Sequence, residues 1–163
     1  MRMDVYLREA QIQDRDLLFQ WANDALVRQN AFHTEQIPYE NHIKWYDNMM
    51  QNPFVYQYIL CDGELPVGQL RLDIKKTTAV IDYSIAQNKR GLGLGYQIIM
   101  LAKEKVVSEI TSVTELIGQV KYGNTASEKV FEKCGFHRIE KAEYIEFAWS
   151  TKGAEYEDHN CNN

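Results

Sequence analysis

The sequence has few cysteines and no long apolar run, and these scarcities exclude several classes of protein. Cys61, Cys134 and Cys161 are odd in number and scattered, so they predict neither a disulfide framework nor a zinc site. The histidines also lack metal-ligand spacing. No apolar run approaches membrane-spanning length, and the first residues lack a signal-peptide core. We therefore expect a cytoplasmic protein that binds no metal and no membrane.

Basic residues are also fewer than acidic residues. With 18 Lys and Arg against 23 Asp and Glu, the net charge is -5, which argues against a general nucleic-acid surface. A hydrophobic content of 45% is typical of a globular protein. The chain of 163 residues fits one domain, which we expect over residues 1–152. Residues 153–163 are polar and uncapped and predict a disordered tail.

Hydrophobic periodicity predicts the element order β-αα-βββ-α-β-α-ββ, a mixed sheet flanked by helices. The expected strands cover residues 4–8, 55–61, 67–73, 78–86, 115–120, 137–139 and 144–149. The expected helices cover residues 15–22, 38–51, 96–107 and 125–134, and a short segment over residues 27–32 separates the first two. Gln13-Asp14 and Asn124 are expected to cap the first and the last of these helices.

A glycine-rich run between the strand at 79–86 and the helix at 96–107 is the most informative segment. It consists of Arg90, Gly91, Leu92, Gly93, Leu94 and Gly95. Glycine permits backbone conformations that other residues resist, and the N–H groups at the start of a helix suit a phosphate. The arginine adds a positive charge at the same place. The G-x-G-x-G spacing differs from the dinucleotide fingerprint, and no Walker Gly-Lys-Ser/Thr follows.

Two motifs together resemble those of the GNAT N-acetyltransferase superfamily. Arg90, Gly93 and Gly95 match its R/Q-x-x-G-x-G/A signature. About thirty residues later, the segment from Asn124 to Phe136 resembles its second motif, N-x-x-A/S-x-x-x-Y-x-x-x-G-F. The resemblance implies a single-domain GNAT fold of the α/β (α+β) class with a mixed, mostly antiparallel sheet. It also implies acetyl-coenzyme A as co-substrate.

The resemblance assigns coenzyme-binding roles to backbone groups. In GNAT folds two parallel strands splay apart, and the pantetheine arm enters the gap; here these would be residues 78–86 and 115–120. The backbone near Ile85 would hold the pantetheine and the acetyl carbonyl, and the amides of residues 91–95 would hold the pyrophosphate. Asn124 either caps its helix alone or also contacts the coenzyme arm.

Acetyl transfer to an amine needs a group that takes a proton from the amine. Asp82 is our candidate base, because it is the only carboxylate within the strand that leads to the glycine run. A charge in a central strand must be solvated, paired or line a cleft, so a paired carboxylate without proton transfer is the alternative. Asp73 and Glu115 are weaker candidates.

The sequence departs from the family pattern at the position of the usual general acid. The tyrosine of the second motif, which often protonates the leaving thiolate, is replaced here by Phe131. A phenylalanine cannot donate a proton. Tyr122 and Tyr83 are the remaining candidates, each with packing as the alternative, and water could also serve.

The first helices predict the acceptor site. Trp21-x-Asn23-Asp24-x-x-Val27-Arg28, followed by His42-x-x-Trp45-Tyr46, resembles a GNAT subgroup acting on nucleotide-linked aminosugars, including pseudaminic-acid-type acetyltransferases. Aromatic faces stack on rings, while amides and arginine bind hydroxyls and phosphates. The expected acceptor-binding residues are Trp21, Asn23, Arg28, Asn30 and His42. The alternative is that the aromatic residues form helix core faces and that the histidine is structural.

Two other functions remain open at this point. The chain could acetylate N-terminal or side-chain amines of proteins, as several GNAT subgroups do. It could also bind acyl-coenzyme A without turnover, as a sensor. A small-molecule amine is the expected partner, and a homodimer is possible.

Overall fold

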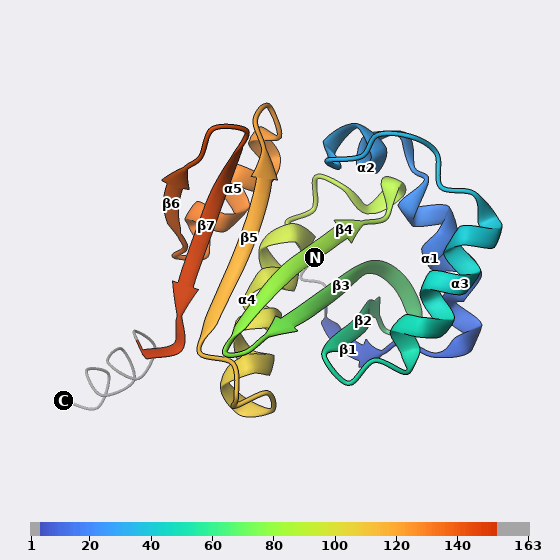
Figure 1. Cartoon of the computed structure of the whole chain (residues 1–163), viewed down its shortest axis with the longest axis horizontal. Coiled ribbons are helices and arrows are strands. Elements are labelled where there is room, and N and C mark those ends of the chain that lie inside the picture. The colour runs from blue at the N-terminus through green and yellow to red at the C-terminus, as the bar shows by residue number, and fades with distance from the viewer. Residues whose placement is uncertain (1–3, 153–163) are drawn as a thin grey trace.

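Seven strands form one mixed sheet in the computed structural model, which describes residues 4–152 (Figure 1). The strand order is β1-β2-β3-β4-β5-β7-β6. The strands are β1 (Val5–Glu9), β2 (Val55–Asp62), β3 (Leu65–Lys75), β4 (Thr78–Ile85), β5 (Glu115–Lys121), β6 (His137–Glu140) and β7 (Tyr144–Ser150). Only the β4–β5 pair is parallel among the described strands. The predicted α+β class and mostly antiparallel sheet are confirmed, while the predicted tail at 153–163 lies outside the described residues.

The helices follow the predicted order with one addition. They are α1 (Arg15–Ala22), α2 (Ala25–Asn30), α3 (Tyr39–Met50), α4 (Leu94–Ser108) and α5 (Thr125–Lys133), with 3-10 turns η1 (Ile12–Asp14) and η2 (Gln87–Lys89). The addition is α2, where the sequence predicted only a short segment. It forms because Asp24 caps it, accepting hydrogen bonds from the amides of Leu26 and Val27 at 3.1 Å. None of the helices in residues 4–152 has the length and apolar character needed to cross a membrane.

The start of α1 differs from the predicted capping. Asp14 occupies the N-cap position but makes no side-chain bond to the helix. Its carboxylate instead accepts two bonds from Arg8, at 2.7 and 2.8 Å, and one from the amide of Gln11. Arg8 therefore holds the pKa of Asp14 below its usual value. This ion pair fixes β1 to the start of α1, which no local pattern predicted.

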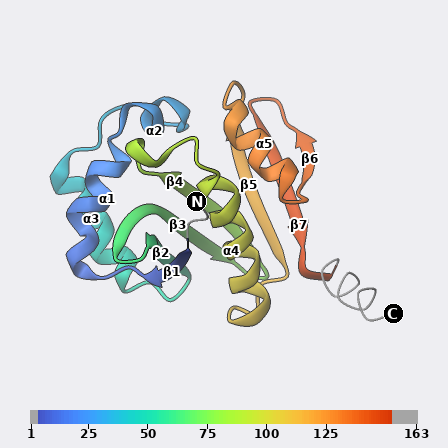
Figure 2. The ribbon, with the colours of Figure 1, turned by 180° about the vertical axis from the view of Figure 1, so that it is seen from behind.

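The helices divide between the two faces of the sheet. Helices α4 and α5 cover the face turned toward the viewer in Figure 2, and their apolar side chains form the larger core with residues such as Leu70, Leu72 and Ile81. Helices α1 and α3 pack on each other and contribute a smaller core around Tyr46 and Ile59. The polar side chains discussed below lie next to this smaller core.

Strands β4 and β5 pair over only half their length. The parallel register runs from Thr78–Glu115 to Ile81–Gly118, after which the strands diverge (Figure 1). Phe131 of α5 lies against β5 where the pairing ends: a Cβ on Gly118 would be 2.4 Å from its ring. The divergence expected from the GNAT resemblance is therefore present.

Candidate functional site

The glycine loop, residues 90–95, presents unpaired backbone amides at the start of α4. Gly91 and Gly93 have φ of 77° and 80°, in the left-handed region that favours glycine. No protein group within residues 4–152 accepts a hydrogen bond from the N–H groups of residues 91–96. Because these donors converge at the positive end of a helix, they suit a diphosphate. This is the fit expected for the coenzyme.

The other residues of the loop explain its packing. A Cβ on Gly95 would lie 3.2 Å from Cγ2 of Val130, so glycine here lets α4 approach α5. The Leu94 side chain is buried in the core and leaves only its N–H for a ligand, while Leu92 is 51% exposed. A ligand on this loop would therefore be held mainly by backbone.

Arg90 is tied to a residue that the sequence did not connect with the loop. Its Nη2 donates to Oδ2 of Asp24 at 2.8 Å, and both side chains are largely buried. Burial opposes the charge on Asp24, but Arg90 and the amides of α2 outweigh it and hold the pKa of Asp24 below its usual value. The positive charge expected at the loop is thus partly balanced.

The remaining predicted coenzyme residues lie beside the divergence of β4 and β5. Ile85 ends β4 and pairs with Gly68 on the β3 side, while the β4–β5 register has already ended at Ile81. Asn124 caps α5 by accepting a hydrogen bond from the amide of Ser127 at 3.3 Å. The predicted cap is confirmed, and its contact with coenzyme stays a prediction.

A cavity of about 380 Å³, here named the acceptor cavity, lies between the first helices and strands β2, β3 and β4. It is lined by Leu18, Trp21, Ala22, Val27, Arg28, Ile37, Asn41, His42, Trp45, Gln57, Gln69, Arg71, Asp82 and Ser84. A second cavity of about 660 Å³, named the loop cavity, is lined by Gln20, Trp21, Asp24, Ser84, Ile85, Ala86, Gln87, Asn88 and Arg90. Trp21 and Ser84 line both cavities, so the acceptor cavity and the glycine loop adjoin.

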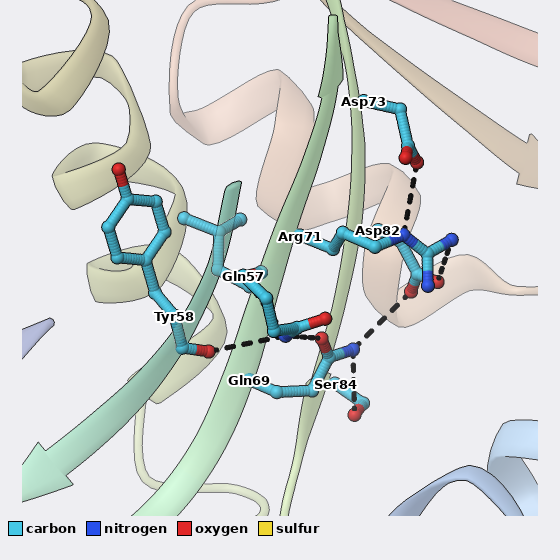
Figure 3. A network of polar contacts seen from close by, with 8 residues as sticks. Gln57, Tyr58, Gln69, Arg71, Asp73, Asp82 and Ser84 are labelled. Atoms are coloured by element: carbon cyan, nitrogen blue, oxygen red, sulfur yellow. Dashed lines mark hydrogen bonds and ion pairs between the residues drawn. The ribbon is translucent and has the colours of Figure 1, made fainter. Parts of the chain in front are cut away.

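Asp82 sits in a network of polar side chains across β2, β3 and β4 (Figure 3). Its Oδ2 is 3.1 Å from Nη2 of Arg71, its cross-strand neighbour. The Gln69 amide donates to Oδ1 of Asp82 at 3.4 Å and to the Ser84 hydroxyl at 3.3 Å. Gln57 in turn donates to the Gln69 carbonyl at 2.8 Å. Half of the Asp82 side chain remains exposed, so it faces the acceptor cavity as a paired yet accessible carboxylate.

Three neighbouring side chains contact the Arg71 guanidinium. It pairs with Asp82 and with Asp73, and its guanidinium lies 5.2 Å from the centre of the Trp45 ring. Burial disfavours its charge, but the two carboxylates outweigh that effect and raise the pKa of Arg71. Its charge is therefore permanent in the acceptor cavity.

Three of the five predicted acceptor residues line the acceptor cavity, namely Trp21, Arg28 and His42. His42 is buried, with Nε2 at 2.8 Å from the carbonyl oxygen of Arg15. Asn23 lies outside the lining, and its amide bonds the backbone of Ile37 at 2.8 and 2.9 Å. Its observed contacts fix the loop that precedes α3.

Asn30 also lies outside the lining of both cavities, at the end of α2. Arg28 donates to the carbonyls of Ala22 at 2.7 Å and His33 at 2.9 Å. No carboxylate pairs with it within the described chain, so its charge is uncompensated there.

The hydroxyls of both tyrosines that are candidate acids are hydrogen-bonded to other protein groups. Tyr122 follows β5 and lines neither cavity, and its hydroxyl donates to the carbonyl of Lys141 at 2.7 Å. The Tyr83 hydroxyl is 2.6 Å from Oγ of Ser127, and burial raises the pKa of Tyr83 to about 12. Phe131 is buried and stacks on Phe147 at 5.3 Å between ring centres. Its ring fills the core beside the divergence.

Sequence reasoning missed the strand side chains of the acceptor cavity. Gln69 and Arg71 on β3 stand directly opposite Ser84 and Asp82 on β4, and Gln57 on β2 stands opposite Arg71. The usable signal was alternation in β3 and β4, because each of these strands carries polar residues at i and i+2 within an otherwise apolar run. The register that aligns them was not readable from the sequence.

The described residues hold no group of three or more His, Cys, Asp or Glu side chains able to bind a metal ion. Cys61 and Cys134 are both buried free thiols. The polar groups of the site are therefore the backbone amides of the glycine loop, the Asp82 network and the arginines.

Comparisons with known proteins agree with this geometry. Residues 4–137 match the model of the acetyltransferase (GNAT) domain family. No curated protein matches the chain in sequence.

Several solved structures share the fold. Spermidine N-acetyltransferase from Vibrio cholerae, in complex with CoA and spermine, has a TM-score of 0.81 at 14% identity and covers 90% of this chain and 95% of its own. The aminoglycoside acetyltransferase AAC(6')-Ib, in complex with ribostamycin and coenzyme A, has a TM-score of 0.82 at 17% identity, with 93% and 96% covered. RimL, a ribosomal-protein α-N-acetyltransferase, has a TM-score of 0.77 at 17% identity, with 90% and 93% covered.

The family model covers most of the chain. In this chain the glycine loop precedes α4, and β4 and β5 diverge beside it, as the GNAT resemblance implied. The chain therefore belongs to the GNAT acetyltransferase family and is an acetyl-coenzyme A-dependent N-acetyltransferase.

Proposed function

We propose that this enzyme transfers the acetyl group of acetyl-coenzyme A to a primary amine of a nucleotide-linked aminosugar, by direct attack in a ternary complex. The observation that carries the acceptor class is the charge of the acceptor cavity. Its lining contains two guanidinium groups, Arg28 and Arg71, and one carboxylate, Asp82. Arg71 is already paired with both Asp82 and Asp73, whereas Arg28 bonds only backbone carbonyls and has no carboxylate partner within the described chain.

A guanidinium without a carboxylate partner in the cavity lining selects against polycations. Polyamines and aminoglycosides carry several ammonium groups, so a cavity that binds them must supply carboxylates in its lining to balance their charge. An acceptor with one amine and a diphosphate has the opposite balance, because arginine binds phosphate through paired donors. Arg28 keeps Nη2 free of protein acceptors within the described chain, since its recorded bonds use Nε and Nη1. It is therefore our candidate phosphate contact.

The rest of the lining suits a ring with hydroxyl groups. Trp21 and Trp45 offer indole faces on which a sugar or base can stack. The Asn41 amide can donate to and accept from hydroxyls, while the Gln57 and Gln69 amides are already bonded within the Asp82 network. A mixture of stacking faces and amides is typical of sites that bind polar rings.

The proposed mechanism uses Asp82 as the base. The acceptor binds with its amine toward Asp82, which takes one proton so that the neutral nitrogen can attack the acetyl carbonyl. The C–N bond forms, the nitrogen releases its second proton to water, and the tetrahedral intermediate then collapses with loss of the C–S bond, so that coenzyme A leaves as thiolate. Backbone groups of β4 beyond Ile81, which lack a β5 partner within the described chain, orient the acetyl thioester. Gln69 and Arg71 hold the Asp82 carboxylate in place.

The leaving thiolate takes its proton from water in this mechanism. Phe131 cannot donate, and the Tyr83 and Tyr122 hydroxyls are both engaged with other groups. A thiolate is a tolerable leaving group, because thiols ionise near pH 8.5. We therefore assign no side chain as the general acid.

The experiment measures thiol release from acetyl-coenzyme A with single amines: a UDP-linked aminosugar, the same free aminosugar, spermidine, kanamycin and an N-terminal peptide. We expect the UDP-linked sugar to give the highest kcat/KM, and Arg28→Gln to raise its KM about tenfold, the size of one lost charge-assisted contact. The matched control is Lys44→Gln, on α3, which also carries His42 and Trp45, but outside the acceptor cavity lining.

Other outcomes decide between the alternatives. Faster turnover of spermidine or kanamycin would overturn the charge argument. Preference for the peptide would favour protein acetylation. Tight coenzyme binding without turnover of any amine would favour a non-catalytic acyl-coenzyme A sensor.

A further inference from the structure

One carboxylate joins the glycine loop to the wall of the acceptor cavity. Oδ2 of Asp24 accepts a bond from Nη2 of Arg90 at 2.8 Å, and the same oxygen accepts from the amides of Leu26 and Val27 at 3.1 Å. Asp24 and Arg90 are separated by 66 positions in the sequence, so the contact exists only in the folded chain.

This contact is linked to both cavities. Asp24 and Arg90 both line the loop cavity. Asp24 is also the N-cap of α2, and α2 carries Val27 and Arg28 into the acceptor cavity. A shift of the Asp24 carboxylate would therefore change the lining of both cavities.

The guanidinium of Arg90 keeps donors for a second anion. Only Nη2 has a protein acceptor within residues 4–152, which leaves Nε and Nη1. The Arg90 side chain is 28% exposed and that of Asp24 15%, so the pair is poorly screened by water. Fixing an arginine before binding removes part of the rotamer entropy that binding would otherwise cost.

We propose that Asp24 is a positioning residue, which holds the Arg90 guanidinium toward the coenzyme diphosphate and at the same time caps the helix that lines the acceptor cavity. The proposal rests on the proposed function, because it takes the glycine loop as the coenzyme site. The two roles of Asp24 separate chemically. Asparagine caps a helix as well as aspartate does, but it carries no charge to hold an arginine.

Two variants separate the roles. Asp24→Asn keeps the cap and loses the ion pair, so we expect the Kd for coenzyme A by calorimetry to rise five- to tenfold. Hydrogen exchange at the Leu26 and Val27 amides should stay as slow as in the native enzyme. Asp24→Ala should raise the Kd equally and also speed exchange at both amides. Asp47→Asn, which removes an exposed carboxylate of α3, is the matched control and should change neither.

A double variant tests the pairing itself. If Asp24 acts through Arg90, Asp24→Asn should add little to the loss caused by Arg90→Gln, because both remove one interaction. Unchanged or tighter coenzyme binding in Asp24→Asn, with weaker binding in Arg90→Gln, would overturn the positioning role and leave Asp24 as a cap alone. Unchanged binding in both Arg90→Gln and Gly93→Val would instead refute the glycine loop as the coenzyme site.

Discussion

The two halves of the site are built from different parts of the chain. The glycine loop is a short continuous segment whose unpaired polar groups within the described chain are backbone amides, with Gly91 and Gly93 at positive φ. The acceptor cavity is lined by side chains from three helices and three strands. A backbone site needs only a local conformation, whereas a side-chain site needs strands in register and helices docked. The first is therefore tolerant of most distant substitutions, and the second depends on the whole fold.

The largest expected effect tests the side-chain half. Asp82→Asn should lower kcat about a thousandfold, within the range for loss of a general base, and leave the Kd for coenzyme A unchanged. Asp73→Asn is the matched control, because Asp73 also pairs with Arg71 but lies outside the acceptor cavity lining. It should keep kcat within about threefold of the native value. Equal losses in both variants, or an unchanged pH profile in Asp82→Asn, would remove Asp82 as the base.

The second effect tests the backbone half. A β-branched residue at φ near +80° is strained by about 2 kcal/mol, so Gly93→Val should weaken coenzyme binding roughly thirtyfold if the loop must keep this conformation. Gly63→Val is the control, because Gly63 has a φ of 60° in the β2–β3 turn with open space around its Cβ position. It should lose similar stability but no coenzyme affinity. Equal affinities in calorimetry would contradict the backbone assignment.

The smallest effect concerns the point where β4 and β5 diverge, which belongs to neither half. Gly118→Ala would place a Cβ 2.4 Å from the Phe131 ring, and such overpacking should cost about 1.5 kcal/mol in urea unfolding. The cost should shrink when Phe131→Leu removes the ring, because the two residues are in contact. If the two substitutions lower the free energy of unfolding additively, the Phe131 ring does not pack against Gly118 at the end of the β4–β5 pairing.

The sequence predicted most elements because each carried a local signal. The strand over residues 55–61 and the helix that ends before Asn52 follow from periodicity and punctuation. Helix α2 was the exception, since six residues give too little periodicity, and the stabilising cap at Asp24 was interpreted only as a break. Asp14 does occupy the N-cap position, but its carboxylate bonds Arg8 of the preceding strand and makes no bond to the helix.

The candidate site was predicted unevenly for the same reason. Trp21, Arg28 and His42 were identified from helix composition and do line the acceptor cavity. Asn23 has the same polar character but turns to the backbone of Ile37. Side-chain direction in a loop depends on which backbone groups lie nearby, and sequence alone does not supply that.

The sequence by itself determined the family, the order of the elements other than α2, and the glycine loop, because each of these depends on residues adjacent in the chain. Only the tertiary structure decided what surrounds Asp82 and Arg90. The pairing of Asp82 with Arg71 follows from the β3–β4 register, and that of Arg90 with Asp24 from the docking of α2 against the loop. Charges far apart in sequence acquire partners only when burial brings them together, and that step is a property of the fold.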